Sequence, residues 1–204
     1  MRRLDKPPPF DLSRLDSRPH IADVYRWLML DEDRNHQIVE DVVSEIQKGR
    51  HPLLLTERRE HATMLAALLR LLGITCEVLR GAMRAKEREA VMAALDDTQV
   101  LIATGKYIGE GFDLPRLDTL FLGLPISWKG SLAQYAGRIN RQSAGKDRVV
   151  IYDYVDASLP TLERMFGRRV KAYEALGYTI ADGEASTPVQ GNLGQAVLRF
   201  TKQE

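Results

Sequence analysis

The sequence predicts an α/β fold in which α-helices cover both faces of a parallel β-sheet. Short apolar runs, bounded by glycine, proline or polar residues, alternate along the chain with longer segments whose apolar residues recur at helical spacing. Such alternation forms βαβ units, in which the strands lie parallel and the helices pack on the sheet. Because ligands bind at the carboxyl ends of parallel strands, we expect functional residues in the loops that follow the strands.

The elements are expected in the following order. The chain begins with two helices, at 21–30 and 33–48. Apolar residues recur at helical spacing in the second, at Ile38, Val42, Val43 and Ile46. The five strands of the sheet are expected at 53–55, 76–79, 100–103, 117–122 and 148–154. Four more helices alternate with them, at 57–72, 82–95, 132–142 and 159–176. Three helices are expected to stop at a glycine, namely Gly49, Gly73 and Gly177.

The chain is expected to contain one domain, at 21–180, which lies between two less regular segments. Residues 1–20 contain three consecutive prolines and no periodicity, so they are expected to form a linker or arm. Residues 181–204 are rich in glycine and polar residues but contain an apolar cluster at 196–200. They are therefore either a C-terminal tail or an extra strand.

Composition excludes several classes of protein. Of the 204 residues, 44% are hydrophobic and 28% are charged, which is typical of globular domains and not of disordered or fibrous chains. The chain has neither an apolar run of the ~18 residues that a membrane span needs nor the apolar stretch of a secretion signal. The single cysteine, Cys76, cannot form an internal disulfide. These observations predict a cytoplasmic protein that does not bind membranes.

Charge gives a weaker indication. The net charge of +1 excludes an overall polycation. The segment 129–173 nevertheless holds nine Lys or Arg against four Asp or Glu. This excess indicates either a face that binds nucleic acid or an ordinary solvated surface.

A glycine-rich loop at 104–115 follows the third expected strand. It has three glycines in seven residues, Gly111 among them, and they permit tight turns and the close approach of a ligand. Thr104 offers a hydroxyl at the strand end, and Asp113 offers a carboxylate that can accept from a ribose hydroxyl. The loop is either a nucleotide or phosphate site or a glycine-rich surface connection.

The expected helix at 132–142 carries Gln134, Arg138 and Arg141 at i, i+4 and i+7, so that they share one face. Two arginines and an amide on one face suit a polyphosphate, because guanidinium groups match phosphate oxygens. A solvated basic helix face is the alternative, but it does not explain Gly137 between them.

Two further strand ends carry groups that contact nucleic-acid backbones. Thr56 and Arg58 follow the first strand, and Gly81 follows the second. A hydroxyl, a guanidinium and a backbone N–H are suited to phosphate contacts. Each is alternatively part of an ordinary helix start, with Thr56 as the N-cap.

In order and spacing, these segments resemble the C-terminal, second RecA-like domain of superfamily 2 helicases and translocases, of the DEAD/DEAH type near the XPB and restriction-helicase branch. The resemblance covers residues 21–178 and implies a RecA-like parallel β-sheet sandwiched between α-helices. It rests on segments 30–35 at the domain start, 53–58 (motif IV), 80–81, 102–115 (motif V) and 134–141, which has the Q-x-x-G-R-x-x-R form of motif VI.

The resemblance also implies a role for each residue. Arg138 and Arg141 are implied to be arginine fingers that reach the γ-phosphate of ATP, with Gln134 in the same network. The residues implied to line the nucleotide are Gly111 and Asp113. The residues implied to contact the phosphate backbone of one tracked strand are Thr56, Arg58, Gly81 and Thr104. Glu110 stands where DEAD-box proteins carry an arginine, which favours DNA over RNA as the partner.

The sequence lacks the phosphate loop G-x-x-x-x-G-K-[ST] that holds ATP and Mg²⁺ in such motors. Asp31-Glu32-Asp33 resembles a DExD box, but no phosphate loop precedes it and it lies at an expected helix start, where acids favour the helix dipole. ATP and Mg²⁺ are therefore expected to bind mainly to an N-terminal RecA-like domain, in cis or in trans. This chain alone is expected not to hydrolyse ATP.

The leading hypothesis is the C-terminal motor domain of an ATP-dependent helicase or translocase. The alternative is a non-catalytic RecA-like module that binds nucleic acid or regulates a partner ATPase. A third possibility is another RecA-like or Rossmann-like nucleotide binder. The four histidines are scattered without metal-site spacing, so no metal site is expected.

Overall fold

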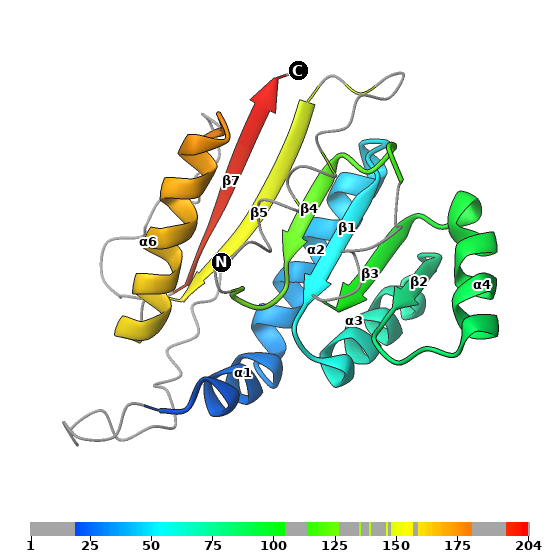
Figure 1. The fold of residues 1–204 in the computed structure, drawn as a ribbon, viewed down its shortest axis with the longest axis horizontal. Helices are drawn as coiled ribbons and strands as arrows, with labels where there is room; N and C mark the ends of the chain where they lie inside the picture. Colours follow the sequence, from blue (N-terminus) through cyan, green and yellow to red (C-terminus); the bar gives the residue numbers. More distant parts are fainter. Residues whose placement is uncertain are drawn as a thin grey trace.

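The computed structural model describes residues 19–104, 114–126, 135, 139, 146, 148–156, 159–180 and 195–203. Within these residues, seven strands form one sheet in the order β2-β3-β1-β4-β5-β7-β6 (Figure 1). The strands are β1 (Pro52–Thr56), β2 (Cys76–Leu79), β3 (Val100–Thr104), β4 (Thr119–Leu122), β5 (Arg148–Asp156), β6 (Thr179–Ile180) and β7 (Gln195–Gln203).

Strands β1 to β5 are parallel to one another, which confirms the predicted α/β fold. Strand β7 pairs antiparallel with β5 along nine residue pairs, and β6 pairs antiparallel with β7. Of the two alternatives for 181–204, the described part, 195–203, forms the extra strand. Its antiparallel direction was not predicted, because the apolar cluster shows no clear alternation.

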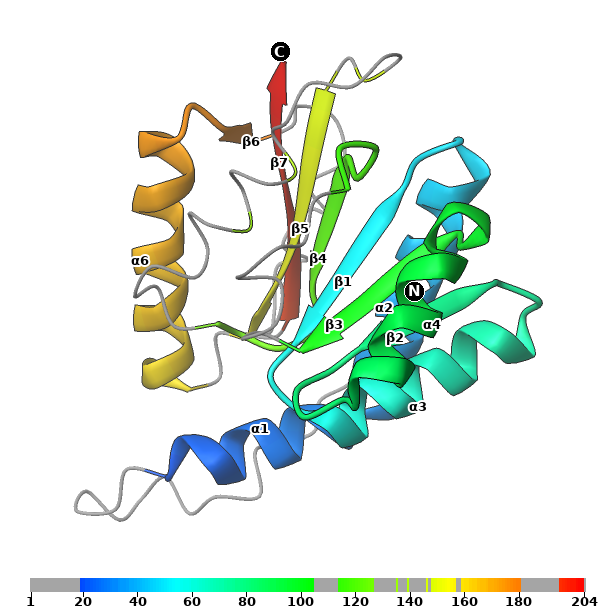
Figure 2. The same ribbon diagram turned by 45° about the vertical axis from the view of Figure 1, so that its right-hand side comes forward.

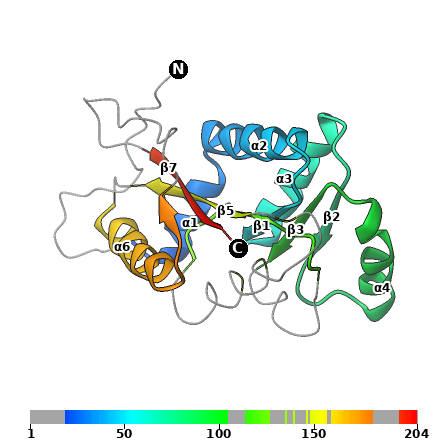
Figure 3. The same ribbon diagram turned by 90° about the horizontal axis from the view of Figure 1, so that it is seen from above.

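The helices lie on both faces of the sheet. They are α1 (Ile21–Met29), α2 (Glu32–Gln47), α3 (Arg59–Leu71), α4 (Ala85–Ala94) and α6 (Pro160–Ala175), with a short 3₁₀ helix, η1 (Leu95–Asp97). Seen from above, α2 and α3 cover one face, whereas α4 and α6 lie on the other (Figure 3). Helix α1 lies across the end of the sheet at which the parallel strands finish (Figures 1 and 2).

The core consists of two layers because successive residues of a strand point to opposite faces. In β1, Leu54 packs against α2 and α3, while Leu53 and Leu55 pack on the face that α4 and α6 cover. All three side chains are fully buried. A smaller cluster joins α1 to the segment after β4 through Val24, Leu28, Leu124, Leu159 and Leu162. This cluster fixes α1 on the end of the sheet.

A buried arginine holds the amino ends of the strands together. Arg50 lies directly before β1, and its Nε atom donates to Thr119 Oγ1 at 2.8 Å. Its Nη2 atom donates to the carbonyl oxygens of Asp118 and Arg148, both at 3.2 Å. Glu45 of α2 balances the charge, with 3.1 Å between Arg50 Nε and Glu45 Oε2. One side chain therefore links β1, β4, β5 and α2.

A second buried arginine attaches α6 to the sheet. Arg169, with 1% of its surface exposed, donates from Nε and Nη2 to the two carboxylate oxygens of Asp153 at 2.7 and 2.9 Å. The hydroxyl of Tyr173 donates to Asp153 at 2.9 Å. Arg169 was counted in the basic segment 129–173, but its charge is neutralised inside the protein. The basic excess of that segment is unchanged by this pair, because Asp153 lies in the same segment, but Arg169 itself does not contribute a surface cation.

Most predicted boundaries agree with the structure within a few residues, and the acidic triplet behaves as a helix start. Asp31 is the N-cap of α2 and accepts from the Arg34 N–H, with Glu32 and Asp33 in the first turn. Helix α3, in contrast, begins at Arg59 with Arg58 as its N-cap. The prediction that Thr56 caps this helix is wrong, because Thr56 is still part of β1 and its hydroxyl has another partner.

Replacement of Gly123 by alanine is expected to destabilise the protein. An added Cβ would lie 3.0 Å from the Leu55 carbonyl oxygen, which also accepts the Gly123 N–H at 2.7 Å. Relieving the contact must stretch this hydrogen bond, so the free energy of unfolding should fall by about 1–3 kcal/mol in urea denaturation. Gly167→Ala is the control, because an added Cβ there meets nothing within 4 Å; it should stabilise α6 by about 0.5–1 kcal/mol. Equal losses for both variants would contradict this explanation.

Loss of the Arg169 guanidinium should leave the Asp153 carboxylate buried without its ion-pair partner. We expect Arg169→Met to lower the free energy of unfolding by about 3–5 kcal/mol. Arg168→Met is the matched control, since Arg168 is the exposed neighbour on the same helix; it should change stability by no more than about 0.5 kcal/mol. If the two variants unfold at the same urea concentration, the ion pair contributes nothing.

Candidate functional site

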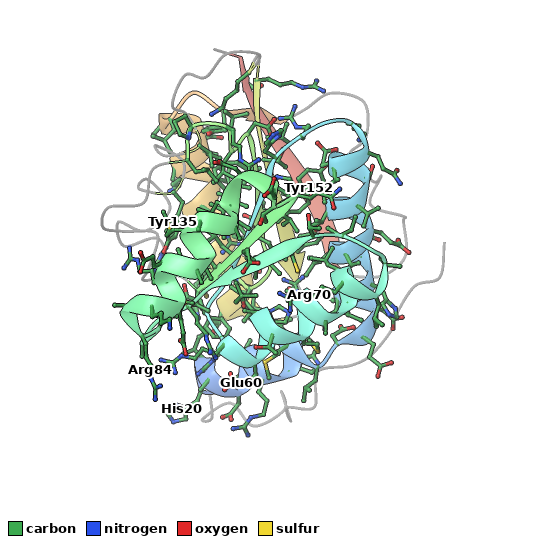
Figure 4. All side chains as sticks on the ribbon, turned by 90° about the vertical axis from the view of Figure 1, so that its right-hand side faces the viewer. His20, Glu60, Arg70, Arg84, Tyr135 and Tyr152 are labelled. Atoms are coloured by element: carbon green, nitrogen blue, oxygen red, sulfur yellow. The ribbon has the colours of Figure 1, made fainter. Side chains whose placement is uncertain are left out.

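Three of the predicted site residues meet at the carboxyl ends of adjacent strands. Thr56 ends β1 and Thr104 ends β3, and the two are register partners in the sheet. Gly81, shortly after β2, donates its backbone N–H to Thr104 Oγ1 at 3.3 Å. Since this hydroxyl accepts from Gly81, its own proton remains available to donate. In Figure 4, the labels of His20, Glu60 and Arg84 show the end of the molecule at which these strand ends lie.

The Thr56 hydroxyl is part of a buried hydrogen-bond chain. His61 Nδ1 lies 2.8 Å from Thr56 Oγ1, and His61 Nε2 lies 2.9 Å from Asn35 Oδ1. Asn35 donates from Nδ2 to the Met29 carbonyl at 2.8 Å, so its Oδ1 accepts. The proton of the neutral imidazole is therefore on Nε2, and Nδ1 accepts from the Thr56 hydroxyl. This chain connects the ends of α1 and β1 with the starts of α2 and α3.

Consequently Thr56 cannot donate its hydroxyl proton to a ligand while this chain is intact. Its side chain is fully buried, and its oxygen also accepts the Arg58 N–H at 3.5 Å. Burial, with a further contribution from the Arg34 charge, lowers the pKa of His61 to about 3. The imidazole is therefore neutral near pH 7, as the hydrogen-bond chain requires.

Arg58 offers the cationic group of the loop after β1. It is half-buried, and its guanidinium carbon lies 5.8 Å from the centre of the Tyr25 ring. The Tyr25 hydroxyl donates to the Pro125 carbonyl at 2.6 Å. Burial, reinforced by the Glu57 carboxylate, raises the pKa of Tyr25 to about 12, so the hydroxyl keeps its proton and remains a donor.

The segment that leaves β4 is held by side chains from three helices. Arg34 of α2 donates from Nη2 to the Gly123 carbonyl at 3.0 Å, and its Nη1 lies 3.6 Å from Asp156 Oδ2. Tyr25 of α1 donates to Pro125, and Arg169 of α6 donates from Nη1 to the Ile126 carbonyl at 3.5 Å. The backbone at this strand end is thereby fixed relative to the loop after β1.

The remaining predicted site residues lie outside the described part of the chain. These residues are Gly111, Asp113, Gln134, Arg138 and Arg141. Within the predicted helix that carries the last three, Tyr135 and Ile139 are described, and both are helical and buried.

Other kinds of site find little support in the described residues. They contain no group of three or more His, Cys, Asp or Glu that could hold a metal ion. None of the described helices is long and apolar enough to cross a membrane.

An open pocket of about 240 Å³ lies among Gly49, Arg50, Asp96, Asp97 and Arg116. It is at the amino ends of the strands, away from Thr56 and Thr104. Cys76 is buried in the core.

No role was predicted from the sequence for Tyr25, Arg34, Asn35 or His61. A signal for His61 was present, because His61, Leu65 and Leu69 are spaced i, i+4 and i+8 and share the buried face of α3. A polar residue on that face must have hydrogen-bond partners. Nothing in the sequence indicated which partners they would be, since Asn35 is 26 residues away.

Comparison with known families assigns the domain. Residues 34–143 match the family model described as the helicase conserved C-terminal domain, and the chain belongs to this family. The predicted resemblance to superfamily 2 helicases, and with it the RecA-like fold, is thus confirmed. The match begins inside α2, so α1 precedes it.

Similar curated proteins include proteins of viruses. The transcript termination protein A18 of camelpox virus (strain CMS) is 28% identical over 166 residues, which is 78% of this chain and 34% of that protein. The transcript termination protein OPG145 of monkeypox virus matches with the same identity and coverage. The chain therefore spans about a third of the length of the curated relatives it matches.

Among solved structures, the crystal structure of T4 UvsW is similar, with a TM-score of 0.63 and 14% sequence identity. The similarity covers 80% of this chain and 36% of that one. At this identity the comparison supports the fold alone.

Acid should destabilise the protein through His61. Its pKa in the folded state is about 3, below the ordinary value of 6.5. The unfolded state thus takes up the proton first, so stability is full above pH 6.5 and is lost as the pH falls toward 3. The free energy of unfolding should drop by about 1.4 kcal/mol per pH unit in this window.

The measurement is urea denaturation between pH 6.5 and 5, where most carboxylates remain ionised. The control is His61→Gln, which lacks the titrating ring and should show a flatter profile over this range. A slope as steep in His61→Gln as in the unchanged protein would assign the pH dependence to other groups.

Proposed function

We propose that this domain is the C-terminal half of an ATP-dependent motor that moves along nucleic acid, with DNA favoured over RNA. The observation that supports this proposal most directly is the grouping of Thr56, Gly81 and Thr104 at the carboxyl ends of adjacent strands, in a domain of the helicase C-terminal family. The description of the viral relatives as transcript termination proteins also supports a role on nucleic acid.

The phosphate contacts are proposed to come from donors that remain available in this arrangement. The Thr104 hydroxyl accepts from Gly81 and keeps its own proton for a phosphate oxygen. The Arg58 guanidinium, in the loop after β1, supplies charge-assisted donors. Thr56 and Gly81 then act by holding these groups in place. Contacts of this type grip the backbone without reading base sequence.

The arginines of motif VI are proposed to act on ATP. Arg138 and Arg141 would stabilise the charge that develops on the transferred γ-phosphoryl group, and Gln134 would belong to the same network. Gly111 and Asp113 would approach the nucleotide from the loop after β3. ATP and Mg²⁺ would be held mainly by an N-terminal RecA-like domain, in cis or in trans, because the 204-residue sequence contains no phosphate loop.

Replacement of Arg138 tests the motor assignment in the full-length protein or its complex with the partner domain. We expect Arg138→Ala to reduce DNA-stimulated ATP hydrolysis by about 10³–10⁵-fold. The affinity for single-stranded DNA should stay nearly unchanged. ATPase rate and DNA dissociation constant are measured on the same preparations.

Arg148→Ala is the matched control, because Arg148 is exposed at the start of β5, at the opposite end of the strands from the proposed grip. It should leave both quantities unchanged. If Arg138→Ala instead weakens DNA binding and leaves the ATPase rate intact, Arg138 is not an arginine finger. The non-catalytic nucleic-acid-binding module would then be the better description.

A further inference from the structure

Tyr25 occupies a position that links α1 to both loops at the strand ends. Its ring lies beside the guanidinium of Arg58, which follows β1, and its hydroxyl donates to Pro125, which follows β4. The residue is 9% exposed and belongs to the apolar cluster that fixes α1 on the sheet. Tyr25 is therefore held at both ends, by packing and by a hydrogen bond.

The face of an aromatic ring restricts an arginine without occupying its hydrogen-bond donors. A guanidinium is attracted to the ring by its charge, while the N–H groups point outward along its own plane. Among the described residues, no carboxylate forms an ion pair with Arg58. The Arg58 donors consequently remain available to an anion, although the side chain is already confined.

We propose that Tyr25 is a positioning residue for nucleic-acid binding, whose ring holds the Arg58 guanidinium in place to meet a phosphate of the bound strand. The inference rests on the proposed function, in which Arg58 contacts the backbone. A long arginine side chain loses rotamer freedom when it binds, and a preformed orientation reduces this cost. Helix α1 precedes residues 34–143, so this support comes from outside the part of the chain that matches the family model.

The ring and the hydroxyl of Tyr25 can be separated by substitution. Tyr25→Phe keeps the ring face and loses only the hydrogen bond to Pro125. Tyr25→Leu and Tyr25→Met remove the ring; methionine fills the buried volume more adaptably and serves as a second variant if leucine impairs folding. Val24→Ala is the matched control on the same helix, because it weakens the same buried cluster and leaves the Tyr25 ring in place.

The experiment measures the dissociation constant of a fluorescein-labelled oligothymidylate by fluorescence anisotropy, with the full-length protein and at several salt concentrations. We expect Tyr25→Leu and Tyr25→Met to weaken binding by about two- to fivefold, the range of an exposed or partly buried cation–π contact. Tyr25→Phe and Val24→Ala should bind as the unchanged protein does. Thermal denaturation of each variant reports its folding.

A double-mutant cycle with Arg58→Ala distinguishes positioning from general support of the fold. If Tyr25 acts through Arg58, then Tyr25→Leu should have no further effect on affinity in the Arg58→Ala background. Additive losses would overturn the inference. An intact affinity in Tyr25→Leu, when Arg58→Ala alone binds more weakly, would also overturn it while leaving the proposed function standing. An unchanged affinity in Arg58→Ala would refute the assignment of Arg58 itself.

Discussion

The arrangement of the strand ends depends on the two hydrogen bonds of the neutral His61 imidazole. The ring accepts a hydrogen bond from the Thr56 hydroxyl and donates one to Asn35 Oδ1, so that it sets the separation between β1 and the start of α2. Adjacent to Asn35, Arg34 reaches the exit of β4. A charged imidazole would present two N–H donors to this hydrogen-bond chain. The Thr56 hydroxyl would then have to accept from His61 instead of donating to it. The shape of the candidate site is therefore determined by a residue that is fully buried.

The layered fold was largely predictable, whereas the interior of the site was not. Strand and helix positions follow from apolar periodicity, which is local information, and the helix stop at Gly73 follows from its positive φ of 76°. The alternative that Thr56 is an N-cap was considered because a hydroxyl before a helix often has that role, but Arg58 is the N-cap of α3. The Thr56 hydroxyl bonds to His61 instead, and which of two local partners a hydroxyl takes depends on tertiary packing. The roles of Gly111, Asp113, Gln134, Arg138 and Arg141 remain predictions from sequence resemblance.

Three buried arginines connect strands and helices in this domain. Arg34, Arg50 and Arg169 each donate to a backbone carbonyl group at or beyond the end of a strand. Each also lies near a carboxylate, at Asp156, Glu45 and Asp153 respectively. Counting basic residues along the sequence therefore overstates the charge available to a polyanion. The arginines that can bind one must be identified by exposure.

The pairing of β7 with β5 has a consequence for the behaviour of fragments. Within the described residues, β5 contributes a nine-residue strand, and β7 occupies its outer edge along the whole length. A polypeptide that ended before β7 would expose that row of amide and carbonyl groups to other molecules, and exposed strand edges promote self-association. On the outer side of β7, the described part of the sheet adds only β6, which pairs with Thr201 and Phe200. A fragment without β7 is therefore expected to aggregate through the uncovered edge of β5.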